Sequence, residues 1–179
     1  MHSLRYTAVE TLSPSDGEAW RSYLAFSCLT HLCEVISLDP MLCPTVHPQD
    51  FEQEADYVVW EDFTADQYHD RAYLEAQVAH LDPARYSFIA VAKEPTDPAE
   101  ARALLGFTFA GYDLLDKDGS ASALLNCGGF PETFSPGDLN AVGLLSTHAQ
   151  AVRIRQALRD NNPDEHHADC YIWALWRRQ

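Results

Sequence analysis

The stretch CYIWALW, residues 170–176, carries the clearest fold information in this 179-residue chain. A β-strand places successive side chains on opposite faces of its sheet. In this stretch both alternating sets are largely apolar, so both faces of the strand must be covered by other parts of the protein. We therefore predict a central strand that begins near Ala168 and ends at Trp176.

Six further runs have the β-branched and aromatic composition of strands. They are LRYTAVE (4–10), EVISL (34–38), DYVVWEDF (56–63), YSFIAVAK (86–93), LLGFTFAGYDLL (104–115) and SASALLN (120–126). The residues Lys117-Asp118-Gly119 between the last two runs are typical of a hairpin turn. Most of the strands follow one another along the chain, which favours antiparallel pairing.

Three segments carry the capping-box pattern that marks the start of a helix. The pairs are Ser15…Glu18, Thr64…Gln67 and Thr147…Gln150, each followed by apolar residues at helical spacing. The elements together predict an α+β fold in a single domain, residues 1–179. We expect a largely antiparallel or mixed sheet of about six or seven strands, with three main helices packed on it.

The chain is strongly acidic, with a net charge of −15, and the charge is unevenly distributed. Residues 22–84 contain twelve Asp and Glu but one base, Arg71. A field of this sign repels nucleic-acid phosphates and anionic lipid, and it favours basic partners. No apolar run approaches the roughly 18 residues of a membrane helix, and the first residues lack a secretory apolar block. We expect a cytoplasmic protein that binds neither nucleic acid nor membrane.

The acids are densest in FEQEADYVVWEDFTADQYHD, residues 51–70, which has seven carboxylates, five aromatics and no Lys or Arg. The acids of such a segment repel one another, and solubility alone does not explain this cost, because acids scattered among lysines dissolve a protein equally well. Carboxylates would speed association with a basic protein, and aromatic side chains would anchor it. The alternative is a solvated acidic face with its rings in the core. The predicted partner-binding residues are Asp50, Glu52, Glu54, Asp56, Trp60, Glu61, Asp62, Phe63, Asp66, Tyr68 and Asp70.

Five cysteines at irregular spacing predict reduced thiols, most of them buried, rather than a disulfide framework. One group (Cys28, His31, Cys33, Cys43) has ligand types that suit zinc, but no second paired knuckle follows it. In DEHHADC, residues 164–170, a strand would point His166 and His167 to opposite faces, so both could bind one metal only if the backbone were irregular. We expect no metal and no cofactor.

A possible catalytic thiol lies in SALLNCGGFPETF, residues 122–134. Cys127 precedes two glycines, which could expose its sulfur on a tight turn, with His148 or His167 as the base. A strand-ending turn with a buried Cys127 is the alternative. Paired carboxylates such as Asp113 and Asp116 are expected by coincidence in so acidic a chain.

Two function hypotheses follow from these patterns. The first is an acidic protein-binding module, by analogy of charge an immunity-type inhibitor that docks onto a basic partner such as a bacterial toxin. The second is a thiol-dependent hydrolase or transferase that uses Cys127 with a histidine base. The sequence leaves the partner, the substrate and the oligomeric state open.

Overall fold

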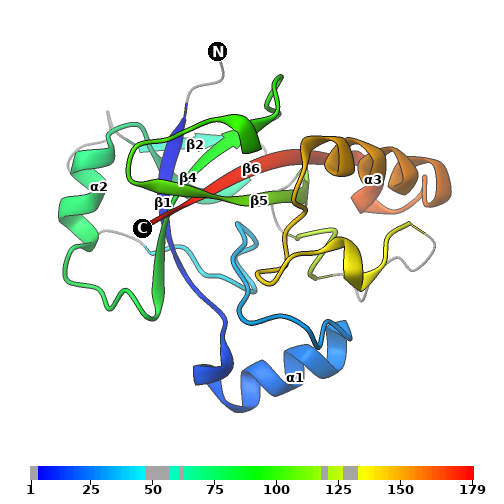
Figure 1. Ribbon diagram of the computed structural model, residues 1–179, viewed down its shortest axis with the longest axis horizontal. Coiled ribbons are helices and arrows are strands. Elements are labelled where there is room, and N and C mark those ends of the chain that lie inside the picture. The colour runs from blue at the N-terminus through cyan, green and yellow to red at the C-terminus, as the bar shows by residue number, and fades with distance from the viewer. Residues whose placement is uncertain (1–3, 47–56, 61–62, 118–120, 127–132) are drawn as a thin grey trace.

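The structure of the protein, a computed structural model, describes residues 4–46, 57–60, 63–117, 121–126 and 133–179. For residues 57–60 and 63–66 it describes the backbone alone. Six strands in these ranges form one antiparallel sheet, in the order β2-β3-β1-β4-β6-β5 (Figure 1). Their bounds are β1 Arg5–Glu10, β2 Tyr57–Trp60, β3 Phe63–Tyr68, β4 Tyr86–Lys93, β5 Phe107–Asp116 and β6 Cys170–Arg178.

Strand β6 is the central strand that the sequence predicts. It pairs with β4 on one side, from Ile89–Arg177 to Lys93–Trp173, and with β5 along nearly its whole length on the other. Trp173 and Trp176 are each 1% exposed. These two tryptophans lie on opposite faces of the strand, so both faces of β6 are covered by other parts of the protein.

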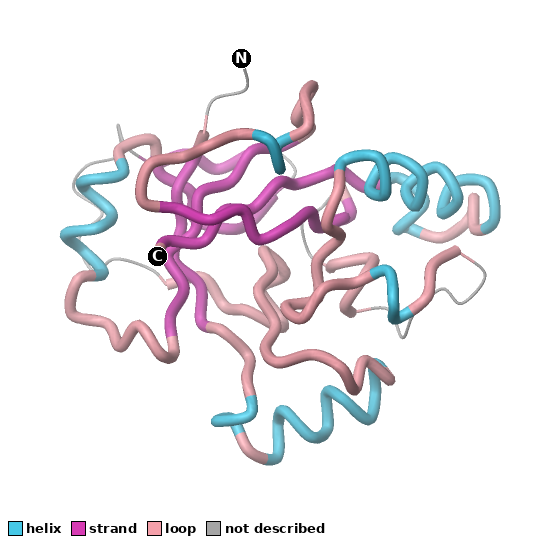
Figure 2. The backbone as a smooth tube through the Cα atoms, in the orientation of Figure 1, coloured by secondary structure: helices cyan, strands magenta, loops and turns pink. Residues whose placement is uncertain are grey.

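Three α-helices complete the α+β fold, which confirms the predicted class. They are α1 (Glu18–Ser27), α2 (Arg71–Val78) and α3 (His148–Asn161). Helix α3 packs on β5 and β6, and α2 packs on β1. Helix α1 lies apart from the sheet, with loops between them (Figure 2), and the Tyr23 hydroxyl donates a hydrogen bond to the Leu125 carbonyl in this loop layer.

The loop layer explains why two predicted strands are wrong. Val35 and Ile36 are fully buried, yet the run 34–38 pairs through an isolated bridge between Leu12 and Val35. The described part of the run 120–126 likewise has one bridge, between Leu115 and Ser122. Both runs are apolar because the loop layer fills the core beneath the sheet, and burial alone does not require a strand.

The capping patterns give mixed results. Thr147 accepts a hydrogen bond from the Gln150 amide at 3.2 Å and starts α3 as predicted. Helix α1 follows Gly17, and the capping box belongs to Ser13 and Asp16 on a preceding 3-10 turn, so the Ser15…Glu18 prediction is wrong.

The pattern Thr64…Gln67 lies in strand β3 and not at a helix start, so this prediction is also wrong. Helix α2 begins six residues later than predicted, where the Asp70 carboxylate accepts hydrogen bonds from the amides of Ala72 and Tyr73. Residues 56–63, predicted as one strand, include β2 and the start of β3, which pair antiparallel.

The β2–β3 hairpin forms one edge of the sheet. Its attachment is slight, because β3 pairs with β1 at Tyr6–Tyr68, whereas β1 pairs with β4 at six positions. Strand β2 is the outermost strand of the described sheet.

Candidate functional site

Five of the eleven residues of the predicted acidic surface lie in the part of the chain that the structure describes. Trp60 ends β2, and Phe63 and Asp66 belong to β3. The other acids of the surface precede or follow β2 in the chain and lie outside the described residues: Asp50, Glu52, Glu54, Asp56, Glu61 and Asp62. Their role as a binding surface stays a prediction.

The last two residues of the predicted surface have defined structural roles. Tyr68 is 3% exposed, and its ring lies 5.9 Å from that of Tyr73, so it packs in the interior. Asp70 is exposed and forms the N-cap of α2. The buried Tyr68 side chain cannot contact a partner, whereas Asp70 stays exposed although its Oδ1 caps the helix. The dense part of the candidate surface is residues 50–66.

The described bases are largely paired with acids elsewhere in the molecule. Arg177 contacts Glu34 at 2.5 Å, and Arg155 contacts Glu94 at 2.6 Å. The ion pairs as a whole join Arg71 and Arg178 to Glu75, Arg85 to Glu10, Lys117 and Arg159 to Asp169, and Arg153 to Asp138. The C-terminal arginines are thus engaged by acids outside the 50–66 segment.

The excess negative charge consequently has a definite place in the sequence. The described residues hold 19 acids and all 12 bases, whereas the residues outside them hold eight acids and no base. Six of these eight acids fall between positions 50 and 62. More than a third of the net charge of −15 is therefore carried by a short segment on either side of β2.

A second group of carboxylates is buried beneath the sheet, and sequence reasoning missed its importance. Asp113, on β5, accepts hydrogen bonds from the Ser37 hydroxyl at 2.5 Å and the Ser122 hydroxyl at 2.6 Å. Asp39 accepts from the Ser122 amide and the Asn126 side chain, each at 2.8 Å. Both aspartates are fully buried.

This network joins β5 to the loop layer rather than forming an accessible site. Burial raises the pKa of Asp113 to about 6, and the hydrogen bonds from Ser122 and Ser37 oppose that rise. A group shielded from solvent on all sides cannot reach a substrate. The available sequence signal is an aspartate inside the apolar strand-like run 104–115.

The cysteine-rich segment does not assemble a metal site among the described residues. Cys28 and Cys33 are exposed, whereas Cys43 is buried and donates its thiol hydrogen to the Val35 carbonyl. Burial raises the pKa of Cys43 to about 12, which disfavours the thiolate that a metal needs. His31 is hydrogen-bonded to the Leu139 carbonyl at 3.2 Å.

The residues of the thiol-enzyme hypothesis are only partly described. Cys127 lies outside the described residues, so its exposure and its neighbours stay predictions. His148 is the first residue of α3, with its ring 5.7 Å from that of Tyr112. His167 is 4% exposed and belongs to a 3-10 helix, η5 (His166–Asp169), that precedes β6.

The predicted strand begins near Ala168, whereas β6 begins at Cys170, and the two histidines lie on a 3-10 helix rather than on extended backbone. In the 3-10 helix the rings of His166 and His167 lie 3.7 Å apart, centroid to centroid. The irregular backbone that two adjacent histidine ligands would need is present here. Cys170 is buried at the start of β6, while His166 is exposed.

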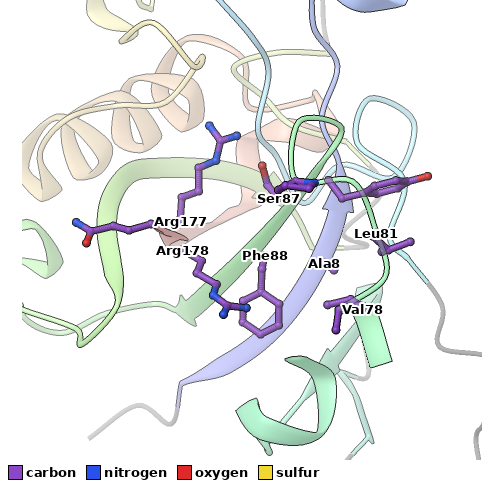
Figure 3. A pocket seen from close by; sticks show the side chains of 11 residues that line it. Ala8, Val78, Leu81, Ser87, Phe88, Arg177 and Arg178 are labelled. Atoms are coloured by element: carbon purple, nitrogen blue, oxygen red, sulfur yellow. The ribbon is translucent and has the colours of Figure 1, made fainter. Parts of the chain in front are cut away.

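A pocket of about 520 Å³ opens beside the end of β6 (Figure 3). Its lining includes Val78, Leu81 and Phe88, with Arg177 and Arg178 at one side. The Arg178 guanidinium lies 5.8 Å from the centre of the Phe88 ring. Arg177 pairs with Glu34, whereas Arg178 shares the carboxylate of Glu75 with Arg71, so the positive charge beside this pocket is partly neutralised.

Three comparisons, with protein-family models, with curated proteins and with solved structures, found no match to this chain. None of the described helices combines the length and the apolar character that crossing a bilayer requires. The function must therefore be argued from the arrangement of the residues themselves.

Proposed function

We propose that this protein is an acidic protein-binding module, most specifically an immunity-type inhibitor of a basic partner such as a bacterial toxin. The observation that carries the proposal is the distribution of charge. Eight of the described arginines and lysines form ion pairs with acids outside residues 50–66. Positions 50–62 hold six acids in thirteen residues with no Lys or Arg among them, and this dense negative charge would attract a basic partner.

The position of β2 supports the same proposal. An edge strand has backbone donors and acceptors on its outer side that can pair with another chain. Carboxylates next to such an edge would attract a basic protein and orient it before the close contact forms. Trp60 and Phe63, on the two strands of the hairpin, are the proposed aromatic anchors.

The proposed inhibitor acts in the cytoplasm and needs no cofactor. The four described cysteines are free thiols, in keeping with a reducing compartment. A carboxylate-rich surface can cover a basic active site by occupying it, without any reaction of its own. The proposal therefore requires binding residues only.

The test uses two variants that remove the same number of charges. The site variant combines Glu52→Gln, Glu54→Gln, Glu61→Gln and Asp62→Asn. The control variant combines Glu18→Gln, Asp97→Asn, Asp160→Asn and Asp164→Asn, all exposed residues outside the segment. Each protein is used as bait in a lysate of its native cells at low salt, and retained proteins are quantified by mass spectrometry.

We expect a basic protein to be retained by the wild type and the control variant and lost with the site variant. With that partner purified, the site variant should associate at least about tenfold more slowly, and added salt should reduce the difference. Retention of no basic protein, or equal retention by all three baits, would contradict the proposal.

A further inference from the structure

Three potential metal ligands meet where β5 ends and β6 begins. Asp116 is the last residue of β5 and pairs with Cys170, the first residue of β6. The 3-10 helix η5 lies directly before β6, so its histidines are carried to the same place. One ligand atom each from Asp116, His166 and His167 lies within 4.8 Å of the other two.

The turn of η5 makes this meeting possible. Successive side chains on a strand diverge, but on a 3-10 helix they are separated by about a third of a turn. The imidazoles of His166 and His167 accordingly lie at 3.7 Å between centroids, with a tilt of 46°. Two neighbours in sequence can then face one ion.

The carboxylate of this group is buried and held in place. Asp116 is 3% exposed, and its Oδ1 accepts a hydrogen bond from the Ala121 amide at 3.3 Å, which orients the carboxylate.

The nearby cations are directed elsewhere. Lys117 and Arg159 both pair with the exposed carboxylate of Asp169, the last residue of η5. Arg159 also donates to the Ala168 carbonyl at 3.2 Å. These contacts hold both positive groups on Asp169.

We propose that Asp116, His166 and His167 bind a divalent transition-metal ion of the zinc class. Two imidazole nitrogens and one carboxylate oxygen form a ligand set that suits zinc, whereas magnesium and calcium prefer oxygen ligands throughout. His166 is exposed and provides the route of entry. Three protein ligands leave a fourth position for water or for a side chain of a bound partner.

The bound ion would connect the end of β5 to the segment that leads into β6. It is independent of the acidic surface, because none of its ligands belongs to residues 50–66.

The test is a titration of the metal-free full-length protein with Zn²⁺ by calorimetry and with Co²⁺ by visible absorption. We expect one tight site with the absorption of a four- or five-coordinate cobalt ion. His166→Gln should weaken binding by at least about 100-fold, since loss of outer-shell partners alone costs 10–100-fold. His80→Gln, which replaces another exposed histidine, should bind as the wild type does.

His166 is chosen because its exposure makes the substitution safe for folding, whereas Asp116 and His167 are buried. Zn²⁺ should raise the melting temperature of the wild type and of His80→Gln, but not that of His166→Gln. The proposal is overturned if no saturable site is found, or if His166→Gln binds as tightly as the wild type. Binding that is lost when thiols are alkylated and is retained in His166→Gln would place the metal on cysteines and also overturn it.

Discussion

Asp113 shows how a single buried side chain makes folding depend on pH. Its carboxyl has a pKa of about 6 in the folded protein against an ordinary value of 3.8, chiefly because burial disfavours the charged form. Between these two values the folded state binds more protons than the unfolded chain. The stability contributed by Asp113 is therefore greatest at low pH and falls as the pH rises through this window.

We expect Asp113→Asn to remove this dependence. The free energy of unfolding of the variant minus that of the wild type should increase from about pH 4 to pH 7, by up to about 3 kcal/mol. Urea denaturation at several pH values measures it, with Asp97→Asn, an exposed aspartate, as the matched control. If this difference in the free energy of unfolding stays constant or decreases with pH, then burial does not raise the pKa of Asp113, and the prediction is wrong.

Single residues also show where sequence reasoning reaches its limit. The sequence predicts Asp113 in a strand and Asp116 directly after it, but the burial of Asp113 also depends on Ser37, which lies 76 residues away in the sequence. The meeting of Asp116 with His166 and His167 depends on the register of β5 against β6. No local pattern encodes that register.

At the scale of elements, a bulge in β5 fixes how the loop layer meets the sheet. The register with β6 shifts between Phe109 and Gly111. Just beyond the bulge, Tyr112 and Leu145 exchange backbone hydrogen bonds at 2.8 and 2.9 Å. Gly111 has a φ of +144°, and a β-carbon there would lie 2.5 Å from the Leu144 β-carbon.

Gly111→Ala is therefore expected to destabilise the protein by about 3 kcal/mol or more, because it combines backbone strain with a clash against the chain. Gly137→Ala is the matched control, since the nearest atom to its β-carbon would be the Ser135 hydroxyl oxygen at 3.8 Å. Thermal and urea denaturation should separate the two variants clearly. Equal stabilities would mean that the loop at Leu144 can move away at little cost.

The elements differ in how well the sequence predicts them. Strand β6 and helix α3 were predictable because their apolar patterns are long and agree with their flanking signals. Strand β3 was not, since FTADQY is polar enough to be read as a helix start and gains its place by pairing with β2. The run containing Val35 and Ile36 failed for the opposite reason, because it is buried without extended pairing.

The whole molecule is governed by its excess negative charge. With a net charge of −15, acids repel one another over distances far longer than those of the ion pairs. Raising NaCl from about 0.02 M to 0.3 M shortens the screening length from about 20 Å to about 6 Å. Such screening reduces the long-range repulsion more than the short-range attraction within each exposed pair.

We therefore expect NaCl to raise the free energy of unfolding by on the order of 1 kcal/mol over this range. Chemical denaturation with urea, which is uncharged, measures the effect. The variant neutralised at Glu52, Glu54, Glu61 and Asp62 should gain less from salt than the wild type does. A fall in stability with NaCl would mean that the ion pairs outweigh the repulsion.

The position of β6 also affects how the protein folds during its synthesis on the ribosome. Strands β4 and β5 do not pair with each other but with β6, which is synthesised after both. At about 5–20 residues per second, the chain between Asp116 and Cys170 takes about three to ten seconds to emerge. During that interval β4 and β5 lack β6, the strand with which both of them pair. Their apolar side chains can then bind chaperones.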